Sequence, residues 1–242
     1  MSIGRIWPSE MIEVQDPLSG IALRQLTNYR AHSHHFYFTN PGWYDGGRRL
    51  LVASDRDNRT NLFGLELHSG QIQQLTDLNP LPLPREVEFL RACVSATGDE
   101  AYFWYGMELR VLDLHGLETR VIYRMEDGWG VSMINCSADG RHVYASVSED
   151  MSSRFRVDYL RGYVGFRETW AARPLSRILR IAVDGSGGQT LFEESYWIGH
   201  VNTSPTRNEL LTFCHEGPWN EVDNRIWGMN VETGEVWKIR GR

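Results

Sequence analysis

The residues best suited to chemistry in this sequence are histidines, arginines and a glutamate near the ends of expected strands. His200 follows Gly199 where an apolar strand is expected to begin, and His215 and Glu216 lie in the turn after the next strand. Side chains at strand ends are often placed to bind ligands. The alternatives are a hydrogen-bonded structural histidine at 200 and a turn that Glu216 stabilises.

Two arginines could bind an anionic ligand. Arg225 stands at the start of an expected strand, and Arg59 lies in the polar loop 55–61. A guanidinium stays charged and binds a carboxylate through two parallel hydrogen bonds. The alternatives are an Arg225 paired with Asp223 or Glu221 on a solvated rim, and an ordinary solvated turn around Arg59.

A histidine cluster precedes the first long strand. On a strand, His32 and His34 would share a face, as two metal ligands might. The sequence offers no third ligand nearby, so we predict no metal site there. His34 is expected either to line a substrate pocket or simply to pack.

The elements that position these residues come from an internal repeat. A turn rich in Gly or Asn, a polar residue and an alternating apolar run recur four times, and the copies begin at Asp45, Ala96, Ala138 and Pro205. Two further short strands follow each copy, and another apolar run separates the units. Four strands per unit at roughly 40–50 residues is typical of a β-propeller blade and unlike the even strand spacing of a β-sandwich.

We therefore predict an all-β chain, a single propeller domain over 1–242 with four complete blades, at about 34–76, 87–124, 129–194 and 197–240. Residues 19–27 resemble an outer strand without inner strands of its own. Propellers commonly close by adding such a strand to a blade from the other terminus. That blade is missing, so the domain is expected to be incomplete at its C-terminus, and its unpaired edges to favour homo-oligomers.

One insertion interrupts the third blade, at about 149–174. Tyr159, Tyr163, Phe166 and Trp170 recur at helical spacing and predict a single apolar stripe on a helix. The helix is expected either to pack on a blade or to form a wall over the binding face, with its aromatic rings against a ligand.

Composition excludes several classes of function. The chain has 242 residues and a formal net charge of −6, which argues against a nucleic-acid partner. It shows neither a signal peptide nor a long apolar run that would cross a membrane. Its three cysteines lack metal-type spacing and are expected to be reduced. We therefore predict a cytoplasmic protein without membrane partners.

Several phrases together resemble the oligogalacturonate lyase family, cytoplasmic enzymes of pectin degradation with a seven-bladed propeller. They run in order along nearly the whole chain: Gln15-Asp16-Pro17, His34 with Tyr37-Phe38, residues 55–61, Trp197-Ile198-Gly199-His200, and Cys214-His215-Glu216-Gly217-Pro218 leading to Arg225-Ile226-Trp227.

The resemblance implies β-elimination cleavage of oligogalacturonides to monouronates. In the family a histidine is the base, and a divalent metal, usually manganese, is bound by His and Gln side chains of later blades. This chain stops before them, so neither base nor metal ligand is assigned here. Arg225 matches the family arginine that contacts substrate beside the reacting bond. The candidates for substrate binding are His34, Tyr37, Arg59, His200, His215 and Glu216.

A second hypothesis belongs to another class. The chain could be a non-catalytic propeller scaffold, a sugar-binding fragment or an interaction module similar to the TolB type. Such a module would bind protein and be indifferent to uronates.

Overall fold

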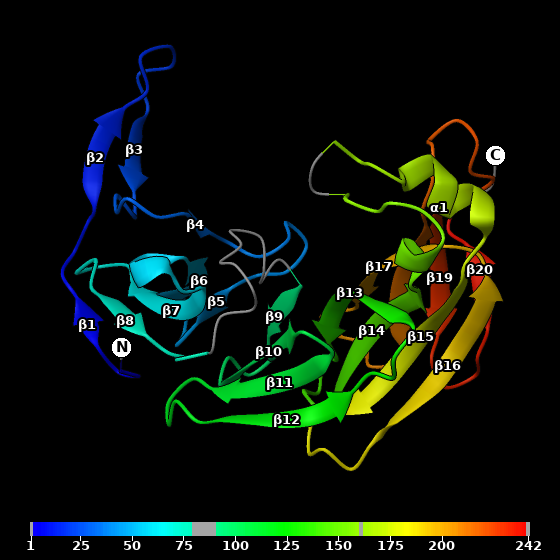
Figure 1. Cartoon of the computed structure of the whole chain (residues 1–242). Coiled ribbons are helices and arrows are strands. Elements are labelled where there is room, and N and C mark those ends of the chain that lie inside the picture. Colours follow the sequence, from blue (N-terminus) through cyan, green and yellow to red (C-terminus); the bar gives the residue numbers. More distant parts are fainter. Residues whose placement is uncertain (1, 79–90, 160–161, 241–242) are drawn as a thin grey trace. The chain divides into compact units, whose positions relative to one another are not determined.

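The computed structural model describes residues 2–78, 91–159 and 162–240, and most of their regular structure is strand. The chain divides into two compact units, Met1–Ala101 with Leu112–Arg120, and Tyr102–Val111 with Val121–Arg242. Figure 1 shows antiparallel sheets whose strands mostly follow one another along the sequence. Neighbouring strands in sequence therefore pair with each other, as expected for propeller blades.

The first sheet belongs to the first unit and has the order β1-β8-β7-β6-β4, with β5 also paired to β6. Its buried core is apolar and is made of Trp7, Leu50, Val52, Phe63, Leu65 and Ile72. Its elements are β1 (Ile6–Trp7), β4 (Ser33–His34), β5 (Trp43–Tyr44), β6 (Arg49–Ser54), the 3₁₀ turn η1 (Arg56–Asn58), β7 (Asn61–Glu66) and β8 (Ile72–Gln74).

Three further sheets have four strands each, in sequential order. The second consists of β9 (Ala92–Val94), β10 (Glu100–Tyr105), β11 (Glu108–Asp113) and β12 (Thr119–Arg124). The third consists of β13 (Trp129–Cys136), β14 (His142–Glu149), β15 (Leu175–Ala182) and β16 (Gly188–Ser195). The fourth consists of β17 (Ile198–Thr203), β18 (Leu210–His215), β19 (Ile226–Asn230) and β20 (Val236–Lys238).

The repeated turn phrases explain why the sheets recur. Gly98 and Gly140 take φ of 79° and 69°, which a residue without Cβ adopts at little cost. A serine before the turn, Ser95 or Ser137, accepts hydrogen bonds through Oγ from backbone N–H groups beyond it. The fourth copy has no glycine, but Ser204 makes the same kind of contact. The serine is therefore shared by the last three copies of the repeat, whereas Tyr44 takes the equivalent position in the first.

Within the second unit, the third and fourth sheets share a core. Tyr144 and Ile178 of the third sheet pack with Val201, Phe213 and Met229 of the fourth. Figure 1 shows these sheets next to each other, with β17 beside β13 and β14. This packing fixes β17 and β18, the two strands that carry most of the candidate site.

The insertion between β14 and β15 differs from the predicted helix. Its elements are the 3₁₀ turn η2 (Met151–Ser153) and the short helix α1 (Phe166–Ala172). Gly162 and Gly165, both with φ of 79°, interrupt the helical spacing before α1. The prediction of one helical stripe from Tyr159 onward was therefore wrong. Tyr159 nevertheless contacts Phe166, with ring centroids 6.5 Å apart.

The predicted closing strand forms in part. Its central residues are β3 (Ala22–Gln25), which pairs with β2 (Ile12–Gln15) in a separate two-stranded sheet. The outer edge of the first sheet is covered instead by β1, which pairs with β8. Ile12, Val14 and Leu23 share one face of the hairpin and are 40%, 40% and 47% exposed. The hairpin therefore presents an apolar face.

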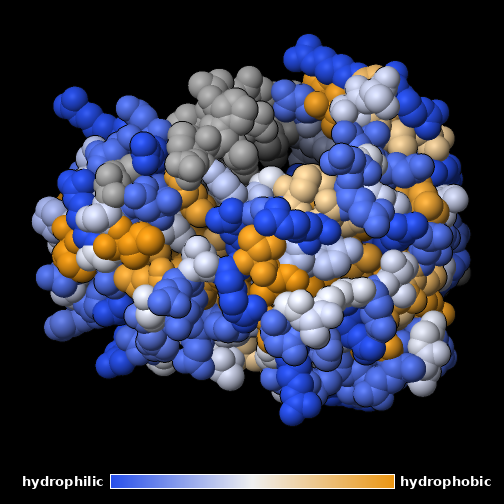
Figure 2. Space-filling view, turned by 60° about the horizontal axis from the view of Figure 1, so that its bottom comes forward, coloured by the Kyte–Doolittle hydropathy of each residue, from blue (hydrophilic) through white to orange (hydrophobic). Residues whose placement is uncertain are grey.

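The surface carries other apolar side chains in scattered groups. Figure 2 shows several separate hydrophobic groups among polar residues on the face that it displays. Of the aromatic side chains that the structure describes, Phe38 and Trp219 are the most exposed, at 83% and 79%. Among the described residues, no helix has the length and apolar character needed to cross a membrane.

Candidate functional site

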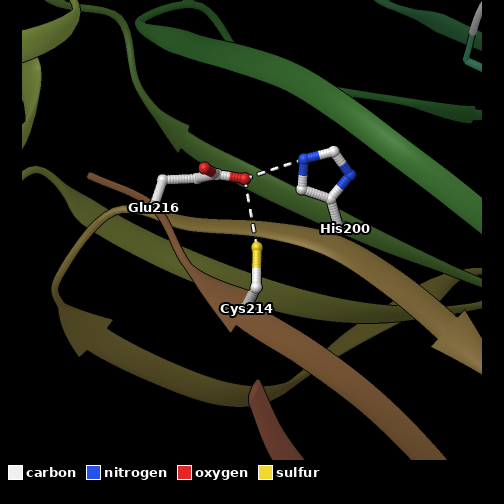
Figure 3. Close-up of side chains that lie close together, drawn as sticks. All are labelled: His200, Cys214 and Glu216. Carbon is white, nitrogen blue, oxygen red and sulfur yellow. Dashed lines mark hydrogen bonds and ion pairs between the residues drawn. The ribbon is translucent and has the colours of Figure 1, made fainter. Parts of the chain in front are cut away.

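Two side chains of the fourth sheet converge on one carboxylate oxygen of Glu216 (Figure 3). His200 Nε2 lies 2.8 Å from Glu216 Oε1, and Cys214 Sγ donates a hydrogen bond to the same oxygen at 3.0 Å. His200 belongs to β17, Cys214 to β18, and Glu216 directly follows β18. Glu216 is therefore the centre of this cluster.

The local backbone explains the convergence. Cys214 and Glu216 are two residues apart, so along an extended chain they point to the same side. The pairing of β17 with β18 is irregular between Gly199 and Asn202, and His200 within it has φ of 50°. Such a bulge redirects a side chain out of the normal alternation. Here it accompanies the approach of His200 to Glu216.

Gly199 makes room for the carboxylate. A Cβ at this position would lie 2.6 Å from Glu216 Oε1. Residue 199 pairs directly with Cys214 across the two strands, so its bare backbone forms one wall of the cluster. Any larger residue would have to displace Glu216.

Burial and hydrogen bonding set the charges of the cluster. Burial alone would raise the pKa of the Glu216 carboxyl, but the His200 contacts, the Cys214 hydrogen bond and the Arg225 charge together hold that pKa below its ordinary value. Burial raises the pKa of the Cys214 thiol, and the Glu216 charge adds to the shift. The buried group is thus an anionic carboxylate beside a neutral thiol.

Arg225 completes the site. Its Nη2 donates to Glu216 Oε2 at 3.0 Å and its Nη1 donates to the Gly217 carbonyl oxygen at 3.1 Å. The guanidinium carbon lies 4.7 Å from the centroid of the Trp219 ring. The Arg225 side chain is 27% exposed, so it is partly accessible.

The rim pairing considered for Arg225 is wrong. Asp223 pairs with Lys238, and Glu221 pairs with Arg167 of α1 at 2.9 Å. The partner of Arg225 is the buried Glu216, which fixes the guanidinium far more closely than an exposed carboxylate would.

His215 lies on the other side of β18 from Cys214 and Glu216. Its ring stacks on Tyr196 with centroids 3.9 Å apart, and its Nε2 lies 3.0 Å from Glu194 Oε2. Burial lowers the pKa of the His215 imidazole, although Glu194 opposes the shift. The side chain is only 6% exposed. The structure thus separates His215 from its sequence neighbour Glu216.

The other three predicted substrate-binding residues belong to the first unit. His34 Nδ1 lies 3.1 Å from the His35 carbonyl oxygen. Tyr37 packs on Phe38, with ring centroids 4.3 Å apart. Arg59 pairs with Asp77 at 3.4 Å and is 42% exposed. Their roles in binding remain predictions.

The insertion contributes aromatic side chains next to the cluster. Trp170 of α1 faces Gly217 so closely that a Cβ there would lie 2.3 Å from its Cδ1. Phe166 and Tyr159 contact Trp197, with centroids 5.2 and 5.0 Å away. These contacts show the insertion packed against the fourth sheet and the loop after β18, the first of the two arrangements predicted for it; a wall over a binding face remains a prediction.

Sequence reasoning missed Cys214, Gly199 and Trp219 as members of the site. The sequence predicts only that Cys214 is reduced, yet its spacing of two from Glu216 is a usable signal. Trp219 stands out in the sequence only as an aromatic residue in a polar loop. The contact of Gly199 depends on strand register, which the sequence does not show.

The cluster has only a limited capacity for metal. Within the described residues, the ligand atoms of His200, Cys214 and Glu216 form one group within 4.8 Å of one another. A thiol and an imidazole suit zinc better than manganese, which prefers oxygen ligands. The three atoms already satisfy one another by hydrogen bonds, and the Arg225 cation pairs with the same carboxylate. The arrangement instead suits a carboxylate that holds the positively charged Arg225 side chain in place.

Comparison with known proteins gives one consistent family. A family model described as oligogalacturonate lyase matches residues 1–242. An oligogalacturonide lyase of Pectobacterium atrosepticum is 25% identical over 244 residues, which cover 99% of this chain and 60% of that protein. An oligogalacturonate lyase of Dickeya dadantii is 26% identical over 230 residues, covering 93% and 56%. The chain thus spans less than two thirds of the length of these curated relatives.

A solved structure supports the fold. An oligogalacturonate lyase in complex with manganese superposes with a TM-score of 0.87 at 23% identity, covering all of this chain and 62% of that one. Together with the sequential four-stranded sheets, this likeness confirms the predicted all-β propeller fold with a helix in the third blade.

Proposed function

Because the chain belongs to the oligogalacturonate lyase family, we propose that it serves the β-elimination cleavage of oligogalacturonides such as digalacturonate. The observation that carries the proposal is the partly exposed Arg225 guanidinium, held by Glu216 and the Gly217 carbonyl. The proposed substrate of the chain is a small anionic sugar, and the proposed reaction belongs to pectin catabolism.

The reaction needs a positive charge at the position of Arg225. A base must remove the C5 proton next to the uronate carboxylate, and negative charge develops on that carboxylate as the proton is removed. The electron pair then forms the C4=C5 double bond, and the C4 oxygen leaves with the electrons of the broken C4–O bond. A fixed cation that binds the carboxylate stabilises this charge without reorganisation. We assign that role to Arg225, because a guanidinium binds a carboxylate through two parallel hydrogen bonds.

The guanidinium retains donors for a substrate. An arginine has five N–H groups, and the described contacts use one for Glu216 and one for Gly217. The remaining N–H groups are proposed to bind a uronate carboxylate. Trp219 lies beneath the guanidinium and extends the same surface with an apolar ring. His200 is half-buried beside this group and is assigned to the pocket wall.

Manganese is bound by one solved member of the family, but the candidate ligands described here do not fit it. The cluster of His200, Cys214 and Glu216 includes a neutral buried thiol, and its carboxylate is occupied by Arg225. A hard cation such as Mn²⁺ prefers carboxylate, carbonyl and water oxygens. We therefore assign neither a metal-binding role nor the role of the catalytic base to His200, Cys214 or Glu216.

The proposal is tested by binding and by product formation. Isothermal titration of the chain with digalacturonate is expected to show binding, and Arg225→Ala is expected to weaken it about tenfold or more, because a charge-assisted hydrogen bond is worth about 1.5–3 kcal/mol. Binding equal to that of the wild type in Arg225→Ala would contradict the assignment.

Mass spectrometry of the chain incubated with digalacturonate and manganese shows whether monouronates form. Products that depend on Arg225 would mean that this chain supplies its own base.

The finer properties are also proposals. A cytoplasmic location follows from the pathway, and the net charge of −6 disfavours a nucleic-acid partner. Unpaired sheet edges and the apolar face of the β2–β3 hairpin favour homo-oligomers. Light scattering checks this last point, since a monodisperse monomer at high protein concentration would count against it.

A further inference from the structure

We propose that Glu216 is a positioning residue, which holds the Arg225 guanidinium in the orientation that presents its free edge to the carboxylate of an acidic sugar. The inference rests on the proposed function of Arg225. It assigns to Glu216 no contact with the sugar. Glu216 was predicted to bind substrate directly, and the geometry points to an indirect role.

The first step is the burial of the carboxylate. Glu216 is 7% exposed, and its backbone N–H donates to the Trp197 carbonyl oxygen at 2.8 Å. The residue is thus anchored to the chain just before β17 and has little surface through which a ligand could reach it. A buried carboxylate must be paired, because an isolated charge in the interior is very costly.

The second step is that the two carboxylate oxygens of Glu216 bind different partners. Oε1 receives the Cys214 thiol and His200 Nε2, while Oε2 receives Arg225 Nη2. Contacts on both oxygens fix the plane of the carboxylate as well as its place. Gly199 permits this arrangement, because a Cβ there would occupy the space of Oε1.

The third step is the clamp on the guanidinium. Nη2 is tied to Glu216 and Nη1 to the Gly217 carbonyl oxygen, so two separate nitrogens of one rigid plane are fixed. The Trp219 ring supports the face of that plane at 4.7 Å. Two ties and a supporting ring determine the direction of the remaining N–H groups. Without these contacts, a long arginine side chain would lose its rotamer freedom when the ligand binds, and this loss of entropy would weaken binding.

The first experiment measures the clamp directly and needs no sugar. Phenylglyoxal modifies arginines at a rate that depends on their accessibility and pairing, and mass spectrometry reads the Arg225 peptide. Glu216→Gln, which keeps the size and removes the charge, is expected to raise the Arg225 modification rate several-fold. An unchanged rate would overturn the proposal.

A matched control lies in the same loop. Glu221 pairs with Arg167 at 2.9 Å and is 35% exposed. Glu221→Gln removes a carboxylate of the same kind and is expected to leave the Arg225 modification rate unchanged. If it accelerates Arg225 as much as Glu216→Gln does, general loosening of the loop explains the result and positioning is overturned.

The second experiment tests whether Glu216 acts through Arg225. Digalacturonate affinity is measured for Glu216→Gln, Arg225→Ala and the double variant. Residues that act as one unit are non-additive in such a cycle, so the double variant is expected to bind no more weakly than Arg225→Ala. Fully additive losses would overturn the inference, because they would mean that Glu216 contacts the sugar independently.

Two further variants keep the test decisive. Glu216→Asp restores the charge and is expected to recover part of the affinity. If Glu216→Gln does not fold, Arg225→Lys carries the test, since it keeps the charge and removes the planar group; positioning predicts weaker binding, and unchanged binding overturns it. A wild-type chain that fails to bind digalacturonate overturns the proposed function, while the modification rates still report on the clamp.

Discussion

At the scale of single residues, the site is built from unlike groups that satisfy one another. A carboxylate, a thiol, an imidazole and a guanidinium converge at Glu216, and each has a hydrogen-bonding or ionic role there. A buried network of this kind is strong only when every member is satisfied. Its exposed side is formed by Arg225 and Trp219, where a ligand would meet it.

Trp219 gives a prediction at this scale. Its ring is 79% exposed and lies beneath the Arg225 guanidinium, so it offers an apolar face beside a cation. Trp219→Ala is expected to weaken digalacturonate binding about three- to tenfold, because aromatic and cation–π contacts are worth roughly 0.5–1.5 kcal/mol. Trp219→Phe is the matched control and should retain most of the affinity in the same titration. Equal losses in both variants would argue against stacking.

At the scale of elements, the insertion and the loop after β18 support each other. Trp170 of α1 packs against Gly217, and its Nε1 donates to Tyr196 Oη at 3.4 Å. The short helix therefore braces the loop that leads to Arg225. It is the packing of the aromatic side chains, more than helical propensity, that defines this part of the chain.

Gly217 gives a prediction at the scale of elements. It has φ of 144°, and a Cβ would lie 2.3 Å from Trp170 Cδ1. Gly187 has a similar φ of 135° with nothing within 4 Å of a Cβ, so Gly187→Ala carries the backbone strain without the clash. Gly217→Ala is expected to cost about 1–3 kcal/mol more in the free energy of unfolding than Gly187→Ala. Chemical denaturation checks this, and equal costs would refute the close packing.

The parts of the fold that depend on residues close together in the sequence are the parts that the sequence predicts well. The turn phrases around Gly98 and Gly140 are local, so they predicted the four-stranded sheets correctly. The helical stripe predicted from Tyr159 to Trp170 forms only from Phe166 onward, because Gly162 and Gly165 take left-handed backbone angles that the spacing of apolar residues does not reveal.

The candidate site was only half predictable. His200, Glu216 and Arg225 were proposed from residue type and family resemblance. Their convergence requires the pairing of Gly199 with Cys214 and the irregular register that follows, and these are properties of the folded sheet. For the same reason the neighbours His215 and Glu216 could not be separated in advance.

At the scale of the whole molecule, each unit contains a half-buried histidine that resists protonation. Burial is the largest cause that lowers the pKa of His35 in the first unit, and burial followed by the Arg180 charge lowers that of His142 in the second. The folded state therefore binds fewer protons than the unfolded state below the ordinary histidine pKa. Stability must rise with pH in that range.

The resulting prediction concerns acid sensitivity. The contribution of these histidines is complete above their ordinary pKa of 6.5 and is lost as the pH falls toward the lowered folded values. The denaturation midpoint is expected to fall between about pH 6.5 and 5, before most carboxylates titrate. His142→Gln should flatten this dependence, whereas replacement of the exposed His68 should not. A midpoint independent of pH in this range would contradict the prediction.

The missing Cβ at residue 199 has a consequence for how such a sequence can diverge. The space that a side chain would need there is filled by Glu216 Oε1. The two positions are therefore under a joint constraint: a residue larger than glycine at 199 can be accepted only together with a shorter one at 216, and the clamp on Arg225 is then lost. Among relatives of this chain, we expect Gly199 and Glu216 to occur together, and we expect a relative that lacks one of them to lack this contact with Arg225 as well.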